Sequence, residues 1–308
     1  MAHDHDHDHG HAPADFNRAF AIGIALNLGF VAVEAYYGWR VDSLALLADA
    51  GHNLSDVAGL VLAWGATFVG RLAPDRRHTY GWRRASILAA FANAILLLVA
   101  MGSLAWEAIE RLSTPAPTEG FTIIAVAAVG VAVNGITAAF FMSGRSSDLN
   151  IRGAFLHMAA DALVSLGVVA AGVLYLWTRW DWLDPVVSLV ITVAIVAGTG
   201  RLFFQSLHLL FDGVPDSIDL GAVQTFLRAQ PGVEDVHDLH VWAMSTSDIA
   251  LTAHLVIPAG HPGDNFLTTL ATALHDRFEI THPTIQVELG RIEHGCAPPA
   301  FPADTKTR

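Results

Sequence analysis

Two histidine–aspartate pairs with the same spacing are the residues of this sequence best suited to chemistry. His52 and Asp56 are four positions apart, and His157 and Asp161 repeat that spacing far downstream. Residues four apart lie on the same face of an α-helix, one turn from each other. Imidazole nitrogens and carboxylate oxygens are ligands that Zn²⁺ accepts, and two such pairs supply four of them. The pattern therefore predicts one metal site assembled from two helices.

The surroundings of the two pairs decide between a metal site and an ordinary polar contact. A single His-x-x-x-Asp pair on a soluble helix is usually a hydrogen-bonded surface or core pair. Both pairs here lie in runs apolar enough to cross a bilayer, where an ionisable side chain costs about 2.5–3.5 kcal/mol and finds no water. The duplication therefore favours a transport site for a divalent cation. Asp49, one turn before His52, is a candidate acceptor that orients the imidazole; a solvated position at the helix end is the alternative.

The elements that must position these residues are long apolar segments. A helix needs about 20 residues to cross a hydrocarbon core of about 30 Å. Six segments meet that length, near residues 19–37, 44–69, 85–109, 121–142, 154–177 and 182–204. Beyond residue 211 the pattern changes to a helix at 219–229, strands at 235–244 and 249–257, a helix at 265–278 and a strand at 284–289.

The predicted fold class is a membrane α-helical protein, with a six-transmembrane-helix bundle followed by a small α+β domain of order α-β-β-α-β. The expected organisation is a disordered His/Asp-rich tail at 1–15, the transmembrane domain at 16–210, the cytoplasmic domain at 211–295 and a flexible tail at 296–308. The first tail alternates His and Asp, a composition that gathers metal and cannot form a packed core; an expression tag is the alternative.

Composition excludes several classes of function. The chain is 53% hydrophobic and 15% charged, whereas soluble domains are about 25% charged. A net charge of −12 argues against nucleic acid as a partner. The single cysteine, Cys296, excludes an intrachain disulfide framework. The acidic N-terminus predicts no signal peptide, and arginines concentrated on one side of the six segments predict that both termini are cytoplasmic.

Five motifs occur in order along the chain. They are Ser43-Leu-Ala-Leu-Leu-Ala-Asp-Ala-Gly-His-Asn-Leu-Ser-Asp56, His78-Thr-Tyr-Gly-Trp82, His157-Met-Ala-Ala-Asp161, Asp184-Pro-x-x-Ser188 and His237-Asp-Leu-His-Val-Trp242. Together they resemble the cation diffusion facilitator family, in particular its bacterial zinc-exporting members. The resemblance implies a homodimer in the bacterial inner membrane, a cytoplasmic domain like a metallochaperone, and exchange of a cytoplasmic divalent cation for protons.

The resemblance also assigns the transport site, carried over position by position, to His52, Asp56, His157 and Asp161. A histidine in the first of these positions resembles zinc-selective members. Imidazole ligands favour Zn²⁺ over Mg²⁺ or Mn²⁺, which prefer oxygen ligands, and Cd²⁺ and Co²⁺ also fit. Zinc is thus expected as the substrate and as a regulatory ion.

Two further metal sites follow from the resemblance alone. In the loop between the second and third helices, Asp75 and His78 match two ligand positions of the family, but Trp82 stands where a third histidine would be. In the cytoplasmic domain His237 and His254 match metal-binding positions. There Gln286 and Glu288 replace the His and Asp of some relatives, and His240 is a nearby candidate.

Two rival functions use the same ligands. An intramembrane metalloenzyme needs an open coordination position and a dedicated acid or base, as in His-Glu-x-x-His sites, and that motif is absent from the sequence. A membrane-embedded metal sensor without transport activity remains the alternative. The sequence therefore predicts a secondary active transporter rather than an enzyme.

Overall fold

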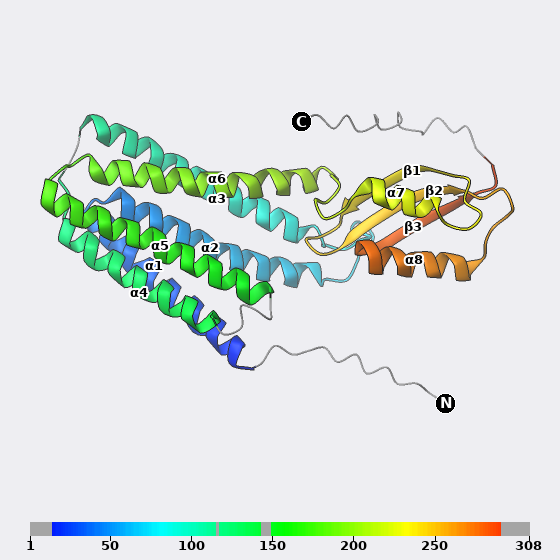
Figure 1. The fold of residues 1–308 in the computed structure, drawn as a ribbon, viewed down its shortest axis with the longest axis horizontal. Helices are drawn as coiled ribbons and strands as arrows, with labels where there is room; N and C mark the ends of the chain where they lie inside the picture. The colour runs from blue at the N-terminus through cyan, green and yellow to red at the C-terminus, as the bar shows by residue number, and fades with distance from the viewer. Residues whose placement is uncertain (1–13, 115–116, 143–148, 291–308) are drawn as a thin grey trace. The chain divides into compact units, whose positions relative to one another are not determined.

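The computed structural model describes residues 14–114, 117–142 and 149–290. Six long helices come first (Figure 1): α1 (Ala14–Arg40), α2 (Leu44–Gly70), α3 (Ala85–Ser113), α4 (Gly120–Phe141), α5 (Leu149–Thr178) and α6 (Leu183–Leu210). They are followed by α7 (Leu220–Arg228), β1 (Asp235–Ala243), β2 (Ile249–Val256), α8 (Asp264–Phe278) and β3 (Ile280–Glu288). The His/Asp-rich stretch up to residue 13 and the tail expected at 296–308 lie outside the described residues.

Four of the long helices are apolar enough to cross a membrane, judged by the length and composition of the described residues. They are Ala85–Ser113, Gly120–Phe140, Phe155–Thr178 and Leu183–Leu210. The other two, α1 and α2, are each 27 residues long. That corresponds to about 40 Å of helix at 1.5 Å per residue. A helical membrane domain with four apolar helices, followed by a small domain with a three-stranded sheet, is thus the observed architecture.

The chain forms two compact units, residues 1–61 with 92–201 and residues 62–91 with 202–308. In the first unit α4 packs along both α5 and α1. Gly130 of α4 makes this approach possible. A Cβ at that position would lie 2.6 Å from the Phe30 ring and 2.9 Å from Ser165 Oγ, closer than atoms can pack. Glycine therefore lets α4 hold α1 and α5 close together, and α5 carries His157 and Asp161.

The sheet of the second unit has the order β1-β2-β3, with β1 and β2 antiparallel and β2 and β3 parallel. Leu251, Ala253 and Leu255 of β2 belong to one buried cluster together with side chains of both α7 and α8. Because alternate residues of a strand point to opposite faces, both helices cover the same face of the sheet. His254 lies between Ala253 and Leu255 and therefore projects from the other, open face.

The third strand begins earlier than the sequence predicts, at Ile280 rather than near residue 284. This earlier start places Pro283 inside the strand, although proline has no N–H to donate to a neighbouring strand. Among the described residues β3 pairs with β2 alone and forms an edge of the sheet, with Pro283 opposite Leu251. Because no described strand pairs with the other side of β3, a missing backbone N–H is tolerated at this proline.

Candidate metal centres

Helix α2 carries His52 and Asp56, and a carboxylate from α6 holds the first turn of that helix. Asp184 Oδ1 accepts a hydrogen bond from Ser43 Oγ at 2.6 Å, and Asp184 Oδ2 accepts one from the Leu44 backbone N–H at 2.8 Å. The Ala45 N–H also donates to Asp184 Oδ1, at 3.4 Å. The first backbone N–H groups of a helix have no partner within the helix and carry partial positive charge. Asp184 therefore caps α2 from another helix.

A second polar contact joins α2 to α5. Ser165 Oγ of α5 donates to Asp49 Oδ2 of α2 at 2.9 Å, and both side chains are fully buried. Ser165 lies one turn after Asp161 on the same helix, and Asp49 lies one turn before His52. The hydrogen bond thus fixes the two helices against each other next to the two histidine–aspartate pairs.

The four side chains of those pairs meet in the first unit. His52 Nε2 lies 3.6 Å from Asp56 Oδ2 and 3.5 Å from Asp161 Oδ1. His157 Nε2 lies 3.2 Å from Asp56 Oδ2 and 3.6 Å from Asp161 Oδ2. The two imidazole rings stand nearly perpendicular, with their centroids 6.1 Å apart. Each imidazole therefore faces both carboxylates, one from its own helix and one from the other helix.

These separations match the edges of a small coordination shell. With metal–ligand bonds of about 2.0–2.1 Å, neighbouring ligands lie about 3.3–3.4 Å apart in a tetrahedral zinc site, but only about 2.9 Å apart in an octahedral magnesium site. Within the described part of the chain, Asp56 Oδ2, Asp161 Oδ2 and His52 Nδ1 are buried without an aligned hydrogen bond. The histidine and aspartate side chains are thus close together, but these buried atoms lack well-aligned hydrogen bonds. An ion at their centre would satisfy the two carboxylate oxygens.

Glu34 of α1 adds another buried carboxyl group behind this cluster. Its side chain is fully buried, accepts a hydrogen bond from Asn53 Nδ2 at 3.4 Å, and lies within hydrogen-bonding reach of Asp49. No salt bridge to Glu34 is found within residues 14–114, 117–142 and 149–290. Asp49 thus contacts Ser165 and Glu34. No aligned hydrogen bond from the described residues reaches His52 Nδ1, and the orienting role of Asp49 toward the His52 imidazole stays a prediction.

Replacing Glu34 by glutamine should raise the thermal stability of the protein. A glutamine amide can donate to Asp49 while its carbonyl still accepts from Asn53, which relieves the apposition of two buried carboxyl groups. We expect a gain of about 1 kcal/mol in the free energy of unfolding, measured by thermal unfolding in detergent. Glu107→Gln, at an exposed position paired with Arg111, is the control and should change little. A lower midpoint for Glu34→Gln would contradict this account.

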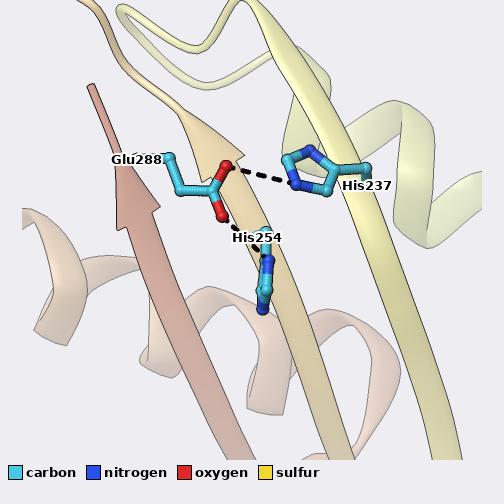
Figure 2. Close-up of side chains that lie close together, drawn as sticks. All are labelled: His237, His254 and Glu288. Carbon is cyan, nitrogen blue, oxygen red and sulfur yellow. Dashed lines mark ion pairs between the residues drawn. The ribbon is translucent and has the colours of Figure 1, made fainter. Parts of the chain in front are cut away.

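A second cluster lies on the open face of the sheet (Figure 2). His237 Nε2 of β1 is 3.2 Å from Glu288 Oε2 of β3, and His254 Nδ1 of β2 is 3.0 Å from Glu288 Oε1. His237 and His254 are directly opposite each other in the β1–β2 register, so strand pairing alone brings the two rings together. Glu288 is almost completely buried, and its Oε2 makes no aligned hydrogen bond with the described residues.

The remaining candidates of this domain have other contacts. Gln286 Nε2 donates to Glu288 Oε1 at 3.0 Å and so orients that carboxylate. His240 Nε2 lies 3.1 Å from Asp238 Oδ1, and the His240 side chain is half exposed. The three ligand atoms that lie within 4.8 Å of one another belong to His237, His254 and Glu288. The structure therefore gathers three of the five residues that the sequence singled out here.

The loop between α2 and α3 holds its two candidates close together. His78 Nδ1 lies 3.1 Å from both oxygens of Asp75, and the backbone N–H groups of Arg77 and His78 donate to Asp75 Oδ1 at 2.7 Å. The hydrogen bonds from His78 and Arg77 lower the pKa of Asp75. The His78 ring packs on Trp82 at a centroid distance of 4.0 Å. Within the described residues, no third potential ligand joins this pair.

Four residues that contact the two clusters or lie beside them had no role assigned from the sequence. They are Ser165, Asp184, Asn53 and Asp238. Ser, Asn and Asp are common in any sequence, and their partners here are mostly far away along the chain: Asp184 caps residues about 140 positions earlier. Asp184 belongs to one of the five motifs that carry the family resemblance, but the motif did not indicate that this residue caps a helix.

The helices and the cluster between them define a multi-pass membrane protein with candidate metal ligands inside its helical domain and a separate cluster of candidate ligands in the small domain that follows. The chain belongs to the cation efflux family. The model of the cation efflux transmembrane domain matches residues 20–211, and the model of the cation efflux protein cytoplasmic domain matches residues 215–289. The resemblance to the cation diffusion facilitators is thereby confirmed, and the protein is a transporter rather than an enzyme.

Three similar proteins come from bacteria. The metal cation efflux system protein CzcD of Cupriavidus metallidurans is 37% identical over 94% of this chain and 92% of its own length. The zinc transporter ZitB of Escherichia coli is 38% identical over 94% and 93%, respectively. A cadmium, cobalt and zinc/H⁺-K⁺ antiporter of Bacillus subtilis is 32% identical over 90% of each chain.

Proposed function

We propose that this protein exports a divalent metal cation, in the first place Zn²⁺, from the cytoplasm in exchange for protons, and that His52, Asp56, His157 and Asp161 hold the transported ion. One observation carries the proposal: Nε2 of each histidine lies 3.2–3.6 Å from an oxygen of both aspartates, which is close to the ligand spacing of a tetrahedral zinc site. The names of the relatives, which include a zinc transporter and a cadmium, cobalt and zinc antiporter, agree with this choice and keep Cd²⁺ and Co²⁺ as further substrates.

The proposed exchange uses the chemistry of imidazole. A histidine must be neutral to bind a metal ion, so metal binding and protonation compete at His52 and His157. Asp56 and Asp161 supply the negative charge that makes the site selective for a cation. Protons arriving from the outer side displace the ion there, and loss of those protons to the cytoplasm restores the site.

The proposed arrangement in the membrane has six spans, α1 to α6, with both termini in the cytoplasm of a bacterial cell. Six spans place both ends of the helical domain on one side. We place the domain boundary between residues 210 and 211, where α6 ends. The transported ion is shared by α2 and α5, so a rocking of the helices that carry the site exposes it to each side in turn.

The proposed assembly is a homodimer formed with the help of the cytoplasmic domain. A domain of about 80 residues buries a small core and gains from an interface or a metal ion. The proposed regulatory ion binds at His237, His254 and Glu288. Two imidazoles and one carboxylate fit zinc, and the unsatisfied Glu288 Oε2 is an atom that such an ion would pair. The pair Asp75 and His78 lacks a third ligand among the described residues and contributes less to this proposal.

Reconstitution into proteoliposomes tests the function directly. Zinc uptake is followed with a metal-sensitive dye and proton movement with a pH-sensitive dye, both inside the vesicle, with an imposed pH gradient. We expect Zn²⁺ entry together with proton exit, weaker responses to Cd²⁺ and Co²⁺, and none to Mg²⁺. Zinc binding without movement of either ion would favour a sensor. Zinc entry that leaves the internal pH unchanged would refute proton exchange.

A further inference from the structure

The alternation of side chains along β1 is interrupted beside the cytoplasmic metal cluster. Val236, Leu239 and Val241 all belong to the buried core. Two residues, His237 and Asp238, stand between the first two of these, where a regular strand would have one. The register with β2 shifts at the same place, with His237 opposite His254 and His240 opposite Thr252. This β-bulge puts His237 and Asp238 on the open face together.

The backbone adopts an unfavourable conformation at the bulge. Asp238 has φ of +50°, in the left-handed region that crowds the Cβ of an L-residue and that Asp and Asn tolerate better than most others. Bulges commonly re-aim a side chain at a functional site. The Asp238 carboxylate is hydrogen-bonded through Oδ1 to His240 Nε2 at 3.1 Å, and its other oxygen, Oδ2, lies 3.4 Å from His254 Nε2.

The two imidazoles of the cluster differ in their outer contacts. His254 faces Glu288 with Nδ1 and Asp238 with Nε2. His237 faces Glu288 with Nε2, and its buried Nδ1 has no hydrogen-bond partner among the described residues. A carboxylate behind a metal-bound histidine fixes both its ring orientation and its tautomer. Only His254 has such a carboxylate within the described residues.

We infer that Asp238 is a positioning residue for the cytoplasmic metal site: its carboxylate accepts the Nε2 proton of His254 and thereby presents the Nδ1 lone pair to an ion held with His237 and Glu288. The inference rests on the proposed binding of zinc at these three residues. It gives a reason for an aspartate with a positive φ in the middle of a strand whose residues on either side pair regularly with β2.

The test uses the full-length protein in detergent, with Asp56→Asn and Asp161→Asn introduced to silence the transport site and the histidines of the 1–15 tail replaced by asparagine, since that tail also gathers metal. Zinc affinity is measured by competition with a chromophoric chelator. We expect Asp238→Asn and Asp238→Gly to weaken binding about 10–100-fold, as loss of an outer carboxylate does at other metal sites. Both replacements accept a positive φ, so the thermal midpoint of the metal-free protein should stay unchanged.

Two further measurements separate positioning from other effects. Asp235→Asn removes the same charge from β1 at a residue that pairs with Arg228, and its affinity should equal that of the parent. Spectra of protein labelled with ¹⁵N-histidine, assigned by comparison with His254→Ala, report which nitrogen of His254 carries the proton. In the zinc-loaded protein, where Nδ1 binds the ion, we expect the Nε2–H proton of the parent to resonate downfield, as donation to a carboxylate requires, and that of the Asp238 variants to lose this shift.

The outcomes are distinct. If His254→Ala leaves the zinc affinity of the silenced protein unchanged, the proposed cytoplasmic site itself is wrong. If His254→Ala removes the ion but both Asp238 variants bind like the parent, the positioning role is overturned and the metal site stands. Equal weakening by Asp235→Asn and Asp238→Asn, or an unchanged His254 Nε2–H resonance in the zinc-loaded Asp238 variants, would also overturn it, because the effect would then come from charge alone or from packing.

Discussion

Replacing Asp161 by asparagine should abolish zinc transport while leaving the protein folded. The Asp161 side chain is almost completely buried, and its two oxygens lie 3.5 Å from His52 and 3.6 Å from His157, so it faces an imidazole from each of the two helices that carry the site. Asparagine keeps the shape but removes one of two anionic ligands. Since loss of an outer contact already costs a metal site about 10–100-fold, loss of a ligand should reduce flux at least 100-fold.

The measurement is uptake of radiolabelled zinc into proteoliposomes, normalised to the amount of folded protein recovered from a sizing column. Glu107→Gln removes an exposed carboxylate from the same helical domain and serves as the matched control. It pairs with Arg111 at 2.7 Å, away from the histidines, and should transport normally. Flux by Asp161→Asn within a factor of two of the parent would remove this residue from the site.

Replacing Asp184 by alanine should strongly destabilise the helical domain. The substitution leaves the Ser43 hydroxyl and the Leu44 and Ala45 N–H groups without their acceptor at a buried helix end. Each unsatisfied buried group costs about 1–3 kcal/mol, so a total loss of about 3–5 kcal/mol is expected. Asp184→Asn keeps one acceptor oxygen without the charge and should lose about half as much.

Thermal unfolding of the purified variants checks this prediction. Asp181→Asn, three residues earlier, is the control, because among the described residues that carboxylate accepts one hydrogen bond, from the Tyr175 hydroxyl, and should matter little. We expect the thermal midpoint to fall from the parent to Asp181→Asn, then to Asp184→Asn, and to be lowest for Asp184→Ala. Since Asp184 fixes the start of α2, zinc flux should fall in the same order. A midpoint for Asp184→Ala equal to that of the parent would show that α2 begins without this cap.

The two histidine–aspartate pairs and the helices that carry them could be predicted from sequence because both depend on local periodicity. His52 with Asp56 and His157 with Asp161 share a helix face through the pitch of the helix alone. The apolar segments reveal long helices by their length. In the sheet, alternation predicts that His254 points away from Leu251, Ala253 and Leu255 before any pairing is known.

Other features needed the folded chain. The start of β3 at Ile280 was missed because the effect of Pro283 depends on which strands lie beside it. The role of Asp184 depends on the start of a helix that is distant in sequence. The bulge at Asp238 depends on a register that exists only once β1 and β2 pair.

By itself, the sequence determined which atoms this protein offers to a metal ion, and on which helix or strand each of them sits, because those properties repeat every few residues along the chain. Only the tertiary structure decided which of these atoms meet and what holds them. It brought α2 and α5 together through Ser165 and Asp49, and it placed Asp238 behind His254. Contacts between distant segments form only where packing and hydrogen bonding of the whole chain are satisfied together, and no short stretch of sequence contains that information.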